Sequence, residues 1–432
     1  MSAQENSTTL KWMRLDNAAK IYPAAKRRNW SNLFRVSATL TEKIDTGVLQ
    51  SALDATVKRF PSIAVRLRKG MFWYCIEELE RAPRVIPDEY YPCTRMSFKE
   101  IKTCAFRVLY YENRIAVEFF HALTDGNGGL IFLKTLLAEY LLQKYGKKIP
   151  SEQGVLDRNE LPAEEEFEDS FLKYEGNFSI GRSEATAYKL KGTYETDGYV
   201  HITTGILSAQ AALECAKKYK TSLTAFLTAV LIDSIIEIQN SAQPNPKRQK
   251  PVKVLIPVNL RKLFPSRTLR NFVLYITPGV DPKMGSYTFE EIVKSVHHQM
   301  GMELTSQRLS AKITKNVRSE KALFLKIMPL FVKNLAMKLV YNMVGEKKSC
   351  ITLSNLGVVS MPKELAESVK RMDFILGMQA QTHNNCGVVC CGGKIYINFA
   401  RNIEESTLER LFFTRLVKMG IHVKVESNHK IQ

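Results

Sequence analysis

A histidine, an aspartate and several glycines stand close together in "VEFFHALTDGNGG", residues 117–129. His121 ends an apolar run. An imidazole accepts a proton near pH 7, and an apolar environment keeps it neutral and available as a base. Asp125 follows four residues later, where its carboxylate can orient the ring or the loop. The glycines, among them Gly126, leave backbone uncovered, so a ligand can approach closely. These residue types indicate general-base chemistry at His121.

The same residues also have a purely structural interpretation. A lone histidine at the end of a strand is more often a packed structural residue than a catalyst. Asp125 is equally typical of a turn or of a helix N-cap. The sequence contains no GxSxG elbow, no P-loop and no dinucleotide-binding glycine pattern. General-base activation of a bound nucleophile is therefore the enzymatic chemistry best supported, and it requires an activated electrophile such as a thioester.

Two strands and a helix are expected to position His121. "CAFRVLYYENRIAVEFFH" contains two strand-like runs around Glu112 and Asn113, which predicts an antiparallel hairpin. Strand alternation sends Phe120 to one face and places on the other face Ile115, Val117, Phe119 and His121. Past the glycines, "LIFLKTLLAEYLLQKYG" is apolar almost all round, which predicts a buried helix that ends at Gly146.

The remaining pattern predicts a mixed protein of two lobes. "DTGVLQSALDATVKRFP" is typical of an amphipathic helix, and Ser208 and Ser222 are predicted to cap two later helices. An acidic stretch at 151–175 separates two halves that each contain predicted helices and strands. A chain of 432 residues also exceeds what one hydrophobic core usually supports. We therefore predict an α/β (α+β) protein with lobes at residues 1–175 and 176–432.

The charge of the chain limits its partners. With 45% hydrophobic and 24% charged residues, the chain is typical of a folded globular protein, but its formal net charge is +19. Such a surface attracts anionic lipid, an acidic protein or a phosphate-bearing cofactor. There is no zinc-finger spacing, no RNP-like string and no run of five or more basic residues, so we expect no nucleic-acid partner.

The cysteines are interpreted as free thiols. Eight of them are scattered along a chain that opens with the polar sequence "MSAQENSTTLKW", which predicts a reducing, cytoplasmic location. The tightest cluster comprises His383, Cys386, Cys390 and Cys391. It lacks a CxxC pair and lies in strand-like sequence, so buried structural thiols are favoured and no metal site is predicted.

The stretch 322–345 is the most hydrophobic of the chain. Lys326, Lys333 and Lys338 interrupt it, and no apolar run reaches the ~18 residues of a membrane span. A packed helix that lines an apolar substrate tunnel is the favoured interpretation. A basic amphipathic helix lying on a bilayer, and so a peripheral membrane contact, is the alternative.

Residues 121–126, "HALTDG", resemble the HxxxDG motif of the chloramphenicol acetyltransferase-like superfamily. Only three of those six positions are fixed, but other segments strengthen the resemblance. They are similar to blocks of the stand-alone alcohol acetyltransferase branch, in the same order, and include "RLDNAAKIYPA", "LQSALDATVKRFPSIAVRLRKG", "PVNLRKLFPSRTLRNFVLYITP" and "TLSNLG". The resemblance covers nearly the whole chain.

This resemblance implies two similar lobes, each a largely antiparallel or mixed sheet flanked by helices, with a tunnel between them. It implies that His121 deprotonates an acceptor hydroxyl or amine, which then attacks a thioester arriving from the opposite mouth. Asp125 would form a structural ion pair with Arg261, and Gly126 would give clearance to the donor. Many relatives, especially condensation domains, have a second histidine where this chain has Phe120. This difference weakens the interpretation of the chain as a peptide-condensation domain.

The tetrahedral intermediate needs a hydrogen-bond donor for its oxyanion. The resemblance points to "TLSNLG", where the candidates are Thr352, Ser354 and Asn355. A strand-ending Ser-Asn-Leu-Gly turn is an equally good interpretation of these residues.

Together the sequence predicts a monomeric acyltransferase that moves an acyl group, such as acetyl, from coenzyme A to a small-molecule alcohol or amine, with no metal. The first alternative is a condensation-type transferase that takes its acyl or peptidyl group from a carrier protein. The second is a non-catalytic member that binds a lipid or acyl molecule at a membrane surface.

Overall fold

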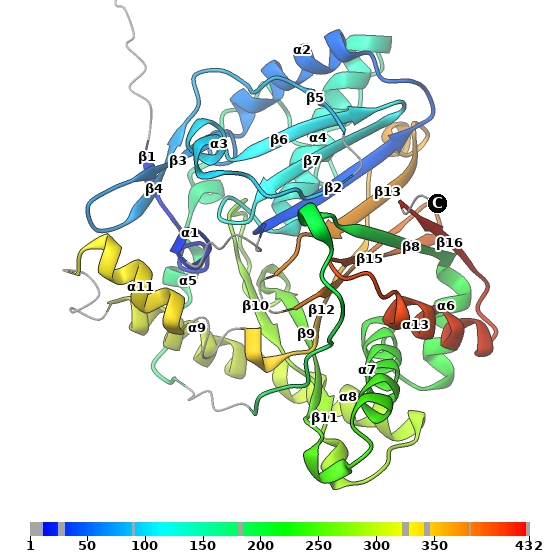
Figure 1. Ribbon diagram of the computed structural model, residues 1–432. Helices are drawn as coiled ribbons and strands as arrows, with labels where there is room; N and C mark the ends of the chain where they lie inside the picture. Colours follow the sequence, from blue (N-terminus) through cyan, green and yellow to red (C-terminus); the bar gives the residue numbers. More distant parts are fainter. Residues whose placement is uncertain are drawn as a thin grey trace, which may run out of the picture.

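The computed structural model describes residues 12–24, 31–88, 91–179, 185–321, 328–340, 346–379 and 382–428. Two larger sheets with helices packed against them form two lobes, and a small sheet lies beside the first lobe (Figure 1). This arrangement confirms the predicted mixed α/β fold of two lobes.

The first lobe is built on a five-stranded sheet. Its order is β13 (Val369–Leu376), β2 (Leu33–Leu40), β7 (Arg114–Phe120), β6 (Phe106–Tyr111) and β5 (Ile86–Pro87). β6 and β7 form the predicted hairpin, and Glu112 in its turn has a positive φ of 47°. The predicted amphipathic helix is α2 (Thr46–Thr56), whose N-cap Asp45 accepts a hydrogen bond from Val48 N.

Helix α4 (Gly126–Tyr145) packs on the same lobe and ends, as predicted, at Gly146, which has a left-handed conformation. The helix starts at Gly126, earlier than predicted, so the glycines lie in its first turn and not in a preceding loop. A Cβ atom on Gly129 would lie 2.8 Å from the Phe34 ring, so α4 covers the sheet face that carries Phe34. The missing side chains let the helix start directly on the sheet.

The small sheet has the order β1 (Trp12–Arg14), β4 (Tyr74–Glu78) and β3 (Val65–Lys69). The shorter elements nearby are α1 (Ile21–Ala24), the 3-10 turn η1 (Val57–Arg59) and α3 (Phe98–Thr103). β3 and β4 are an antiparallel hairpin with Gly70 in its turn.

The second lobe contains a mixed sheet. Its order is β10 (Val273–Ile276), β9 (Val252–Asn259), β12 (Ile351–Val358), β14 (Asn384–Cys391), β15 (Lys394–Arg401), β8 (His201–Ser208) and β16 (Val423–Ser427), and β11 (Gly279–Val280) also pairs with β9. β12 runs parallel to both β9 and β14, whereas the other pairs are antiparallel. β14 and β15 form an antiparallel hairpin around Gly392 and Gly393.

Helices pack on this second sheet and on one another: α6 (Ala209–Lys218), α7 (Leu223–Ala242), α8 (Phe289–Glu303), α9 (Ser306–Lys321) and α13 (Thr407–Lys418). α12 (Lys363–Ala366) instead contacts β13 of the first sheet, and α11 (Leu330–Val340) contacts α1. The predicted caps Ser208 and Ser222 accept hydrogen bonds from Ala211 N and Ala225 N. In the described part of the chain, α7 alone is long and apolar enough to cross a membrane, but most of it is buried in the lobe, so it is a core helix.

Short turns complete the chain: η2 (Glu164–Phe167), α5 (Ser170–Lys173), η3 (Thr196–Gly198), η4 (Pro246–Arg248), η5 (Leu260–Lys262), η6 (Pro282–Met284) and η8 (Glu346–Lys348). Of the hydrophobic stretch predicted at 322–345, only residues 328–340 lie within the described residues.

Two segments connect the lobes. The acidic stretch runs through η2, where the buried carboxylate of Glu166 accepts two hydrogen bonds from Arg59 at 2.6 and 2.8 Å. Its backbone oxygen also accepts a bond from Leu269 N of the second lobe. β13, which lies in the second half of the chain, pairs with β2 of the first lobe. The boundary at residues 175 and 176 stays a prediction, since the sheet of the first lobe draws on both halves.

Candidate active site

His121 directly follows β7 at the edge of the first lobe. Its backbone N donates to the carbonyl of Asn32 at 2.8 Å, which holds the residue beside the start of β2. The imidazole stacks on Tyr22, with centroids 4.7 Å apart and planes 13° from parallel, and meets the ring of Phe34 edge-on at 5.1 Å. The ring is therefore packed between two aromatic side chains, although the residue keeps part of its surface exposed.

One imidazole nitrogen of His121 has a partner from the other lobe. Nδ1 lies 3.2 Å from Oδ1 of Asn271. The amide nitrogen of Asn271 donates to the carboxylate of Asp16 at 3.2 Å, which orients the amide so that its oxygen faces the histidine. Because an amide oxygen only accepts, Nδ1 carries the proton and Nε2 keeps its lone pair. This tautomer is the one that a base acting through Nε2 needs.

Asp16 is itself fixed and fully buried. Its carboxylate accepts from the backbone N of Ala19 at 2.7 Å and from the backbone N of Asn271 at 3.3 Å, and the guanidinium of Arg270 lies 3.8 Å away. Burial raises the pKa of Asp16 above its ordinary value, and the positive charge of Arg270 opposes that rise. The chain of contacts thus runs from Asp16 through Asn271 to His121.

The environment favours the neutral form of His121. Burial lowers the pKa of the imidazole below its ordinary value of 6.5, while a bond with its own backbone, the charge of Asp125 and the bond with Asn271 act in the opposite direction. Desolvation dominates because the aromatic packing around the ring excludes water. The imidazole is accordingly unprotonated near neutral pH.

The carboxylate of Asp125 both caps helix α4 and forms an ion pair. As the N-cap of α4, its Oδ1 accepts from the backbone N of Asn127 at 3.1 Å and of Gly128 at 3.2 Å. Its Oδ2 forms an ion pair with Arg261 at 2.7 Å and accepts from the backbone N of Phe272 at 3.0 Å. The N-cap and the ion-pair interpretations of the sequence therefore both describe this residue.

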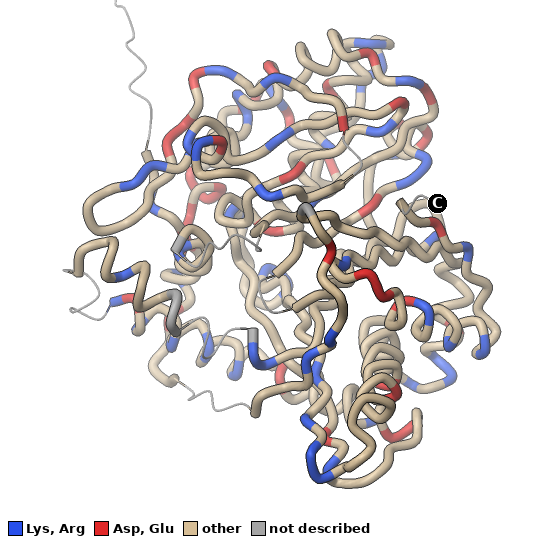
Figure 2. The backbone as a smooth tube through the Cα atoms, viewed as in Figure 1, with Lys and Arg blue, Asp and Glu red and all other residues tan. Residues whose placement is uncertain are grey.

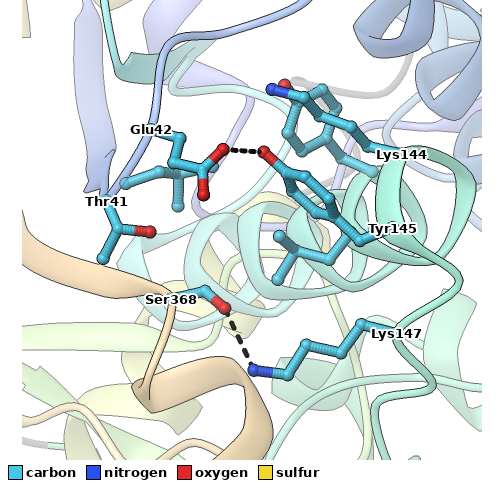
Figure 3. A pocket seen from close by; sticks show the side chains of 9 residues that line it. Thr41, Glu42, Lys144, Tyr145, Lys147 and Ser368 are labelled. Atoms are coloured by element: carbon cyan, nitrogen blue, oxygen red, sulfur yellow. Dashed lines mark hydrogen bonds between the residues drawn. The ribbon is translucent and has the colours of Figure 1, made fainter.

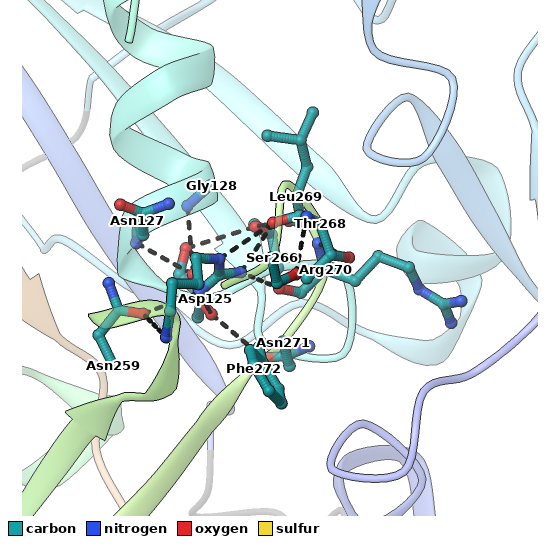
Figure 4. Close-up of polar contacts among 12 residues, drawn as sticks. Asp125, Asn127, Gly128, Asn259, Ser266, Thr268, Leu269, Arg270, Asn271 and Phe272 are labelled. Atoms are coloured by element: carbon teal, nitrogen blue, oxygen red, sulfur yellow. Dashed lines mark hydrogen bonds and ion pairs between the residues drawn. The ribbon is translucent and has the colours of Figure 1, made fainter. Parts of the chain in front are cut away.

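Arg261 joins the two lobes through its ion pair with Asp125, whose surroundings are drawn in Figure 4. Besides Asp125, its guanidinium donates to the carbonyl of Thr268 at 2.9 and 3.1 Å and to that of Arg270 at 2.6 Å. These bonds fix the loop that leads into Asn271. The pair of Asp125 and Arg261 therefore positions the partner of His121, in addition to fixing the start of α4.

The glycines of the motif allow the second lobe to approach. A Cβ atom on Gly126 would lie 2.6 Å from Cδ2 of Leu356 on β12. A Cβ atom on Gly128 would overlap the backbone carbonyl of Leu269. The space next to Gly126 is thus filled by a side chain of the second lobe, which gives a packing reason for this glycine alongside the predicted clearance for a donor.

The three oxyanion candidates lie on β12 and differ in orientation. The amide of Asn355 donates to Thr224 Oγ1 of α7 at 3.0 Å and accepts from Gly357 N, so it points into the second lobe. The hydroxyl of Thr352 accepts from Gln379 at 3.2 Å. Thr352 and Ser354 alternate with Asn355 along the strand and thus take the other face. Within the described residues, none of the three forms a hydrogen bond with His121.

The predicted cysteine cluster shows no metal-binding arrangement. Cys386 is buried within β14, and His383 contacts Asn402 and Tyr194. In residues 382–428 and the other described ranges, no group of three His, Cys, Asp or Glu side chains is placed to hold a metal. All eight cysteines are free thiols.

A cavity of about 130 Å³ opens at the far end of α4 (Figure 3). It lies between Tyr145, whose hydroxyl donates to Glu42 at 2.6 Å, and Lys147, which donates to Ser368 at 3.2 Å. α4 has 20 residues and rises about 1.5 Å per residue, so this cavity is roughly 30 Å from the HxxxDG motif. It is not part of the candidate active site.

A larger cavity of about 460 Å³ lies between the lobes. Its walls include Arg35 and Asp373 from the first sheet and Thr204 and Asn398 from the second. Arg35 is paired with Asp88 at 2.7 Å, and the other arginines of the wall are paired in the same way. His121 does not line this cavity, so the continuous tunnel through the base stays a prediction.

Asp16, Asn271 and Tyr22 were not singled out from the sequence. Asp16 and Tyr22 lie in "RLDNAAKIYPA" and Asn271 in "RTLRNFVLYITP", both within the segments that carry the family resemblance. Asp16 and Asn271 are 255 residues apart, so no spacing indicates that they meet.

The fold is that of known acyltransferases and condensation domains. TRI101 of F. sporotrichioides, complexed with coenzyme A and T-2, matches with a TM-score of 0.63 at 12% identity over 96% of this chain and 99% of that one. Polyketide synthase associated protein 5 from Mycobacterium tuberculosis gives 0.56 at 15% identity over 94% and 96%. The epimerization domain of tyrocidine synthetase B gives 0.60 at 11% identity over 97% and 98%.

These likenesses confirm the fold of the chloramphenicol acetyltransferase-like superfamily, which the resemblance of the sequence implied. Residues 193–395 match the model of the alcohol acetyltransferase family. The matched residues include Arg261 and Ser354 but not His121. No relative is found among curated protein sequences.

Proposed function

We propose that the protein transfers an acyl group from a coenzyme A thioester to an alcohol or amine, with His121 as the general base. The observation that carries this proposal is the fixed tautomer of His121. Asn271 holds the proton on Nδ1, and the imidazole is neutral near pH 7. The match to the alcohol acetyltransferase family supports the reaction class.

In the proposed reaction, Nε2 of His121 removes the proton from the acceptor hydroxyl or amine as its oxygen or nitrogen attacks the thioester carbonyl. A tetrahedral intermediate forms with the negative charge on the former carbonyl oxygen. When the intermediate collapses, the C–S bond breaks and the coenzyme A thiolate takes the proton back from Nε2. The base is thereby regenerated in each cycle, and no metal or redox step is involved.

Ser354 and Thr352 are the candidate oxyanion donors that the geometry supports best. The amide of Asn355 donates to Thr224 of α7, whereas the Thr352 hydroxyl only accepts from Gln379 and keeps its own proton for donation. Ser354 lies on the face of β12 opposite to Asn355, and the neighbouring Leu356 touches Gly126 of the motif. A hydroxyl here would donate to the developing oxyanion.

Coenzyme A is the proposed donor because TRI101, a protein of the same fold, is complexed with it, and because its phosphates suit a chain of net charge +19. A carrier protein is the second candidate, since condensation domains share the fold. The eight free thiols support a reducing, cytoplasmic location. Two lobes joined in one chain support a monomer.

The test is the release of free thiol from acetyl-CoA with a panel of alcohols and amines. His121→Ala should lower kcat/KM at least about 100-fold, the minimum that general-base catalysis usually contributes. Equal thiol release by the wild type and the variant would disprove the role of His121. Release with an acylated carrier protein, and none with coenzyme A, would establish the alternative donor.

A further inference from the structure

Helix α11 has the opposite polarity to an ordinary surface helix. The side chain of Lys333 is fully buried, whereas Phe331 and Leu335 are 71% and 61% exposed. Residues four apart lie on one face of a helix, so Phe331 and Leu335 form a single outward-facing apolar surface. In a globular protein the apolar face of such a helix normally packs on the core. The outward face of α11 is therefore suited to a non-aqueous environment.

Specific contacts fix this orientation. Nζ of Lys333 donates to the carbonyl of Phe72 at 2.9 Å and lies 3.3 Å from the ring centre of Trp73. The backbone N of Leu330 donates to the carbonyl of Met71 at 3.1 Å. All three partners, Met71, Phe72 and Trp73, belong to the turn between β3 and β4. Rotation of α11 to bury its apolar side chains would break the bonds that satisfy the buried ammonium.

The same turn enlarges the apolar surface. Met71 is 78% exposed and Phe72 is 42% exposed, and both are held against the start of α11 by the bonds above. We call Met71, Phe72, Phe331 and Leu335 the docking face. These residues come from two segments more than 250 positions apart in the sequence. Contiguous exposed apolar side chains of this kind mark interaction sites.

Positive charge borders the docking face. Helix α9 carries five cations and one acid, Glu320. Three of the cations are in ion pairs, Arg308 and Lys312 with Glu303 and Lys321 with Glu175. The other two are Lys315 and the exposed Arg318, which donates to the backbone carbonyls of Gly176 and Asn177. Glu320 pairs with Lys20, which in turn lies over the Trp73 ring beside Lys333, so the end of α9 reaches this region.

At the other side of the docking face, the exposed Lys69 adjoins the β3–β4 turn. Figures 1 and 2 show α9, α11 and this turn on one side of the molecule, with Lys and Arg positions along them.

We propose that the docking face binds the surface of an anionic lipid bilayer. The apolar side chains enter the interfacial region, while Lys315 and Arg318 of α9 and Lys69 face the anionic headgroups, which is the pattern of helices that lie in a membrane surface. A second copy of the chain is a poorer occupant, because a two-fold contact would bring the cations of both α9 helices together.

The test uses the full-length protein and vesicle sedimentation. Phosphatidylcholine vesicles that contain phosphatidylglycerol are compared with vesicles of phosphatidylcholine alone. The variant Phe331→Ser with Leu335→Ser changes two exposed side chains. The control variant is Leu213→Ser with Met284→Ser, which are 44% and 83% exposed on α6 and η6, away from α11 in Figure 1. Thermal unfolding followed by circular dichroism checks that both variants fold.

We expect the wild type and the control to bind the phosphatidylglycerol vesicles, and binding to fall by at least about tenfold in the Phe331 and Leu335 variant, because two large apolar side chains no longer enter the interface. Vesicles without anionic lipid should bind less of every protein. The proposal is wrong if the wild type stays in the supernatant at low salt, or if the variant binds as well as the control.

Sedimentation velocity without lipid tests whether a second copy of the chain, and not a bilayer, covers the docking face. A concentration-dependent dimer that Phe331→Ser with Leu335→Ser abolishes would show that a second copy covers the docking face, and would overturn the bilayer assignment. These measurements record binding only, so they stand whether or not His121 catalyses acyl transfer.

Discussion

At the scale of single residues, the candidate site depends on one proton position. His121 is packed between Tyr22 and Phe34, and Asn271 contacts its Nδ1. The aromatic packing lowers the pKa of the imidazole, whereas Asn271 sets the tautomer. The two effects can be measured separately, because the first fixes the pH at which the base becomes protonated and the second fixes how well it works when neutral.

The pH dependence of wild-type activity follows from the lowered pKa. Only neutral His121 is a base, so kcat/KM should be constant near pH 7 and fall as the pH drops through the pKa of the imidazole. Because burial lowers that pKa, the acid limb should have an apparent value below 6.5. Measurement of kcat/KM between pH 5 and 8 tests this expectation. An acid limb centred above 6.5 contradicts it.

Asn271→Ala should lower kcat with little effect on the KM of the donor. The variant loses the acceptor for Nδ1–H, and a hydrogen bond of about 1 kcal/mol corresponds to roughly a five- to tenfold loss in rate. Asn271 also raises the pKa of His121, so its removal should move the acid limb to lower pH.

The matched control for Asn271→Ala is Asn402→Ala, which removes an amide oxygen 3.2 Å from Nδ1 of another histidine, His383. The control should change neither kcat nor the acid limb. A loss of kcat in Asn271→Ala without a shift of the acid limb would indicate a merely structural role.

At the scale of elements, local patterns in the sequence predicted more than contacts between distant segments. The hairpin of β6 and β7, the amphipathic α2 and the C-cap Gly146 follow from periodicity and turn residues. The start of α4 was misplaced because three glycines disfavour a helix in isolation, and the approach of the second lobe overrides this preference.

The contact between Asp16 and Asn271 left no local signal at all, since it joins two loops 255 residues apart. The ion pair of Asp125 and Arg261 was predicted, but only through the family resemblance. That Arg261 also holds the loop next to Asn271, through its bond to the carbonyl of Arg270, is seen only in the structure.

Arg261→Ala should destabilise the junction between α4 and the second lobe. It leaves the buried carboxylate of Asp125 without its counter-charge, for which a cost of about 3–5 kcal/mol is expected. Urea denaturation measures this change in the free energy of unfolding. Asp125→Asn with Arg261→Ala should be less destabilised than Arg261→Ala alone, because the amide still caps α4 and carries no charge. If the double variant is the less stable of the two, the unpaired charge is not the cause.

At the scale of the whole molecule, the two halves of the chain build one structure. β13 from the second half pairs with β2 along seven registered residue pairs, and the loop of the second half that carries Asn271 completes the surroundings of His121. A base from one lobe and its positioning residue from the other make the relative placement of the lobes part of the proposed chemistry. Binding through the proposed docking face would also orient the whole molecule on the bilayer surface.

The fragment 1–175 is therefore predicted not to fold by itself. Without β13, the edge of β2 is unpaired, and seven of the eight β2 residues are buried in the intact protein. An exposed apolar edge strand favours aggregation. Circular dichroism and size-exclusion chromatography should show an aggregated or unfolded fragment, and co-expression with 176–432 should recover a soluble complex.

Fusion of residues 363–379 to 1–175 through a flexible linker, which restores the β13 pairing, should improve solubility over a fusion to a scrambled segment. A monomeric 1–175 with a cooperative melt would instead establish it as an independent domain and leave β13 as a dispensable addition to its edge.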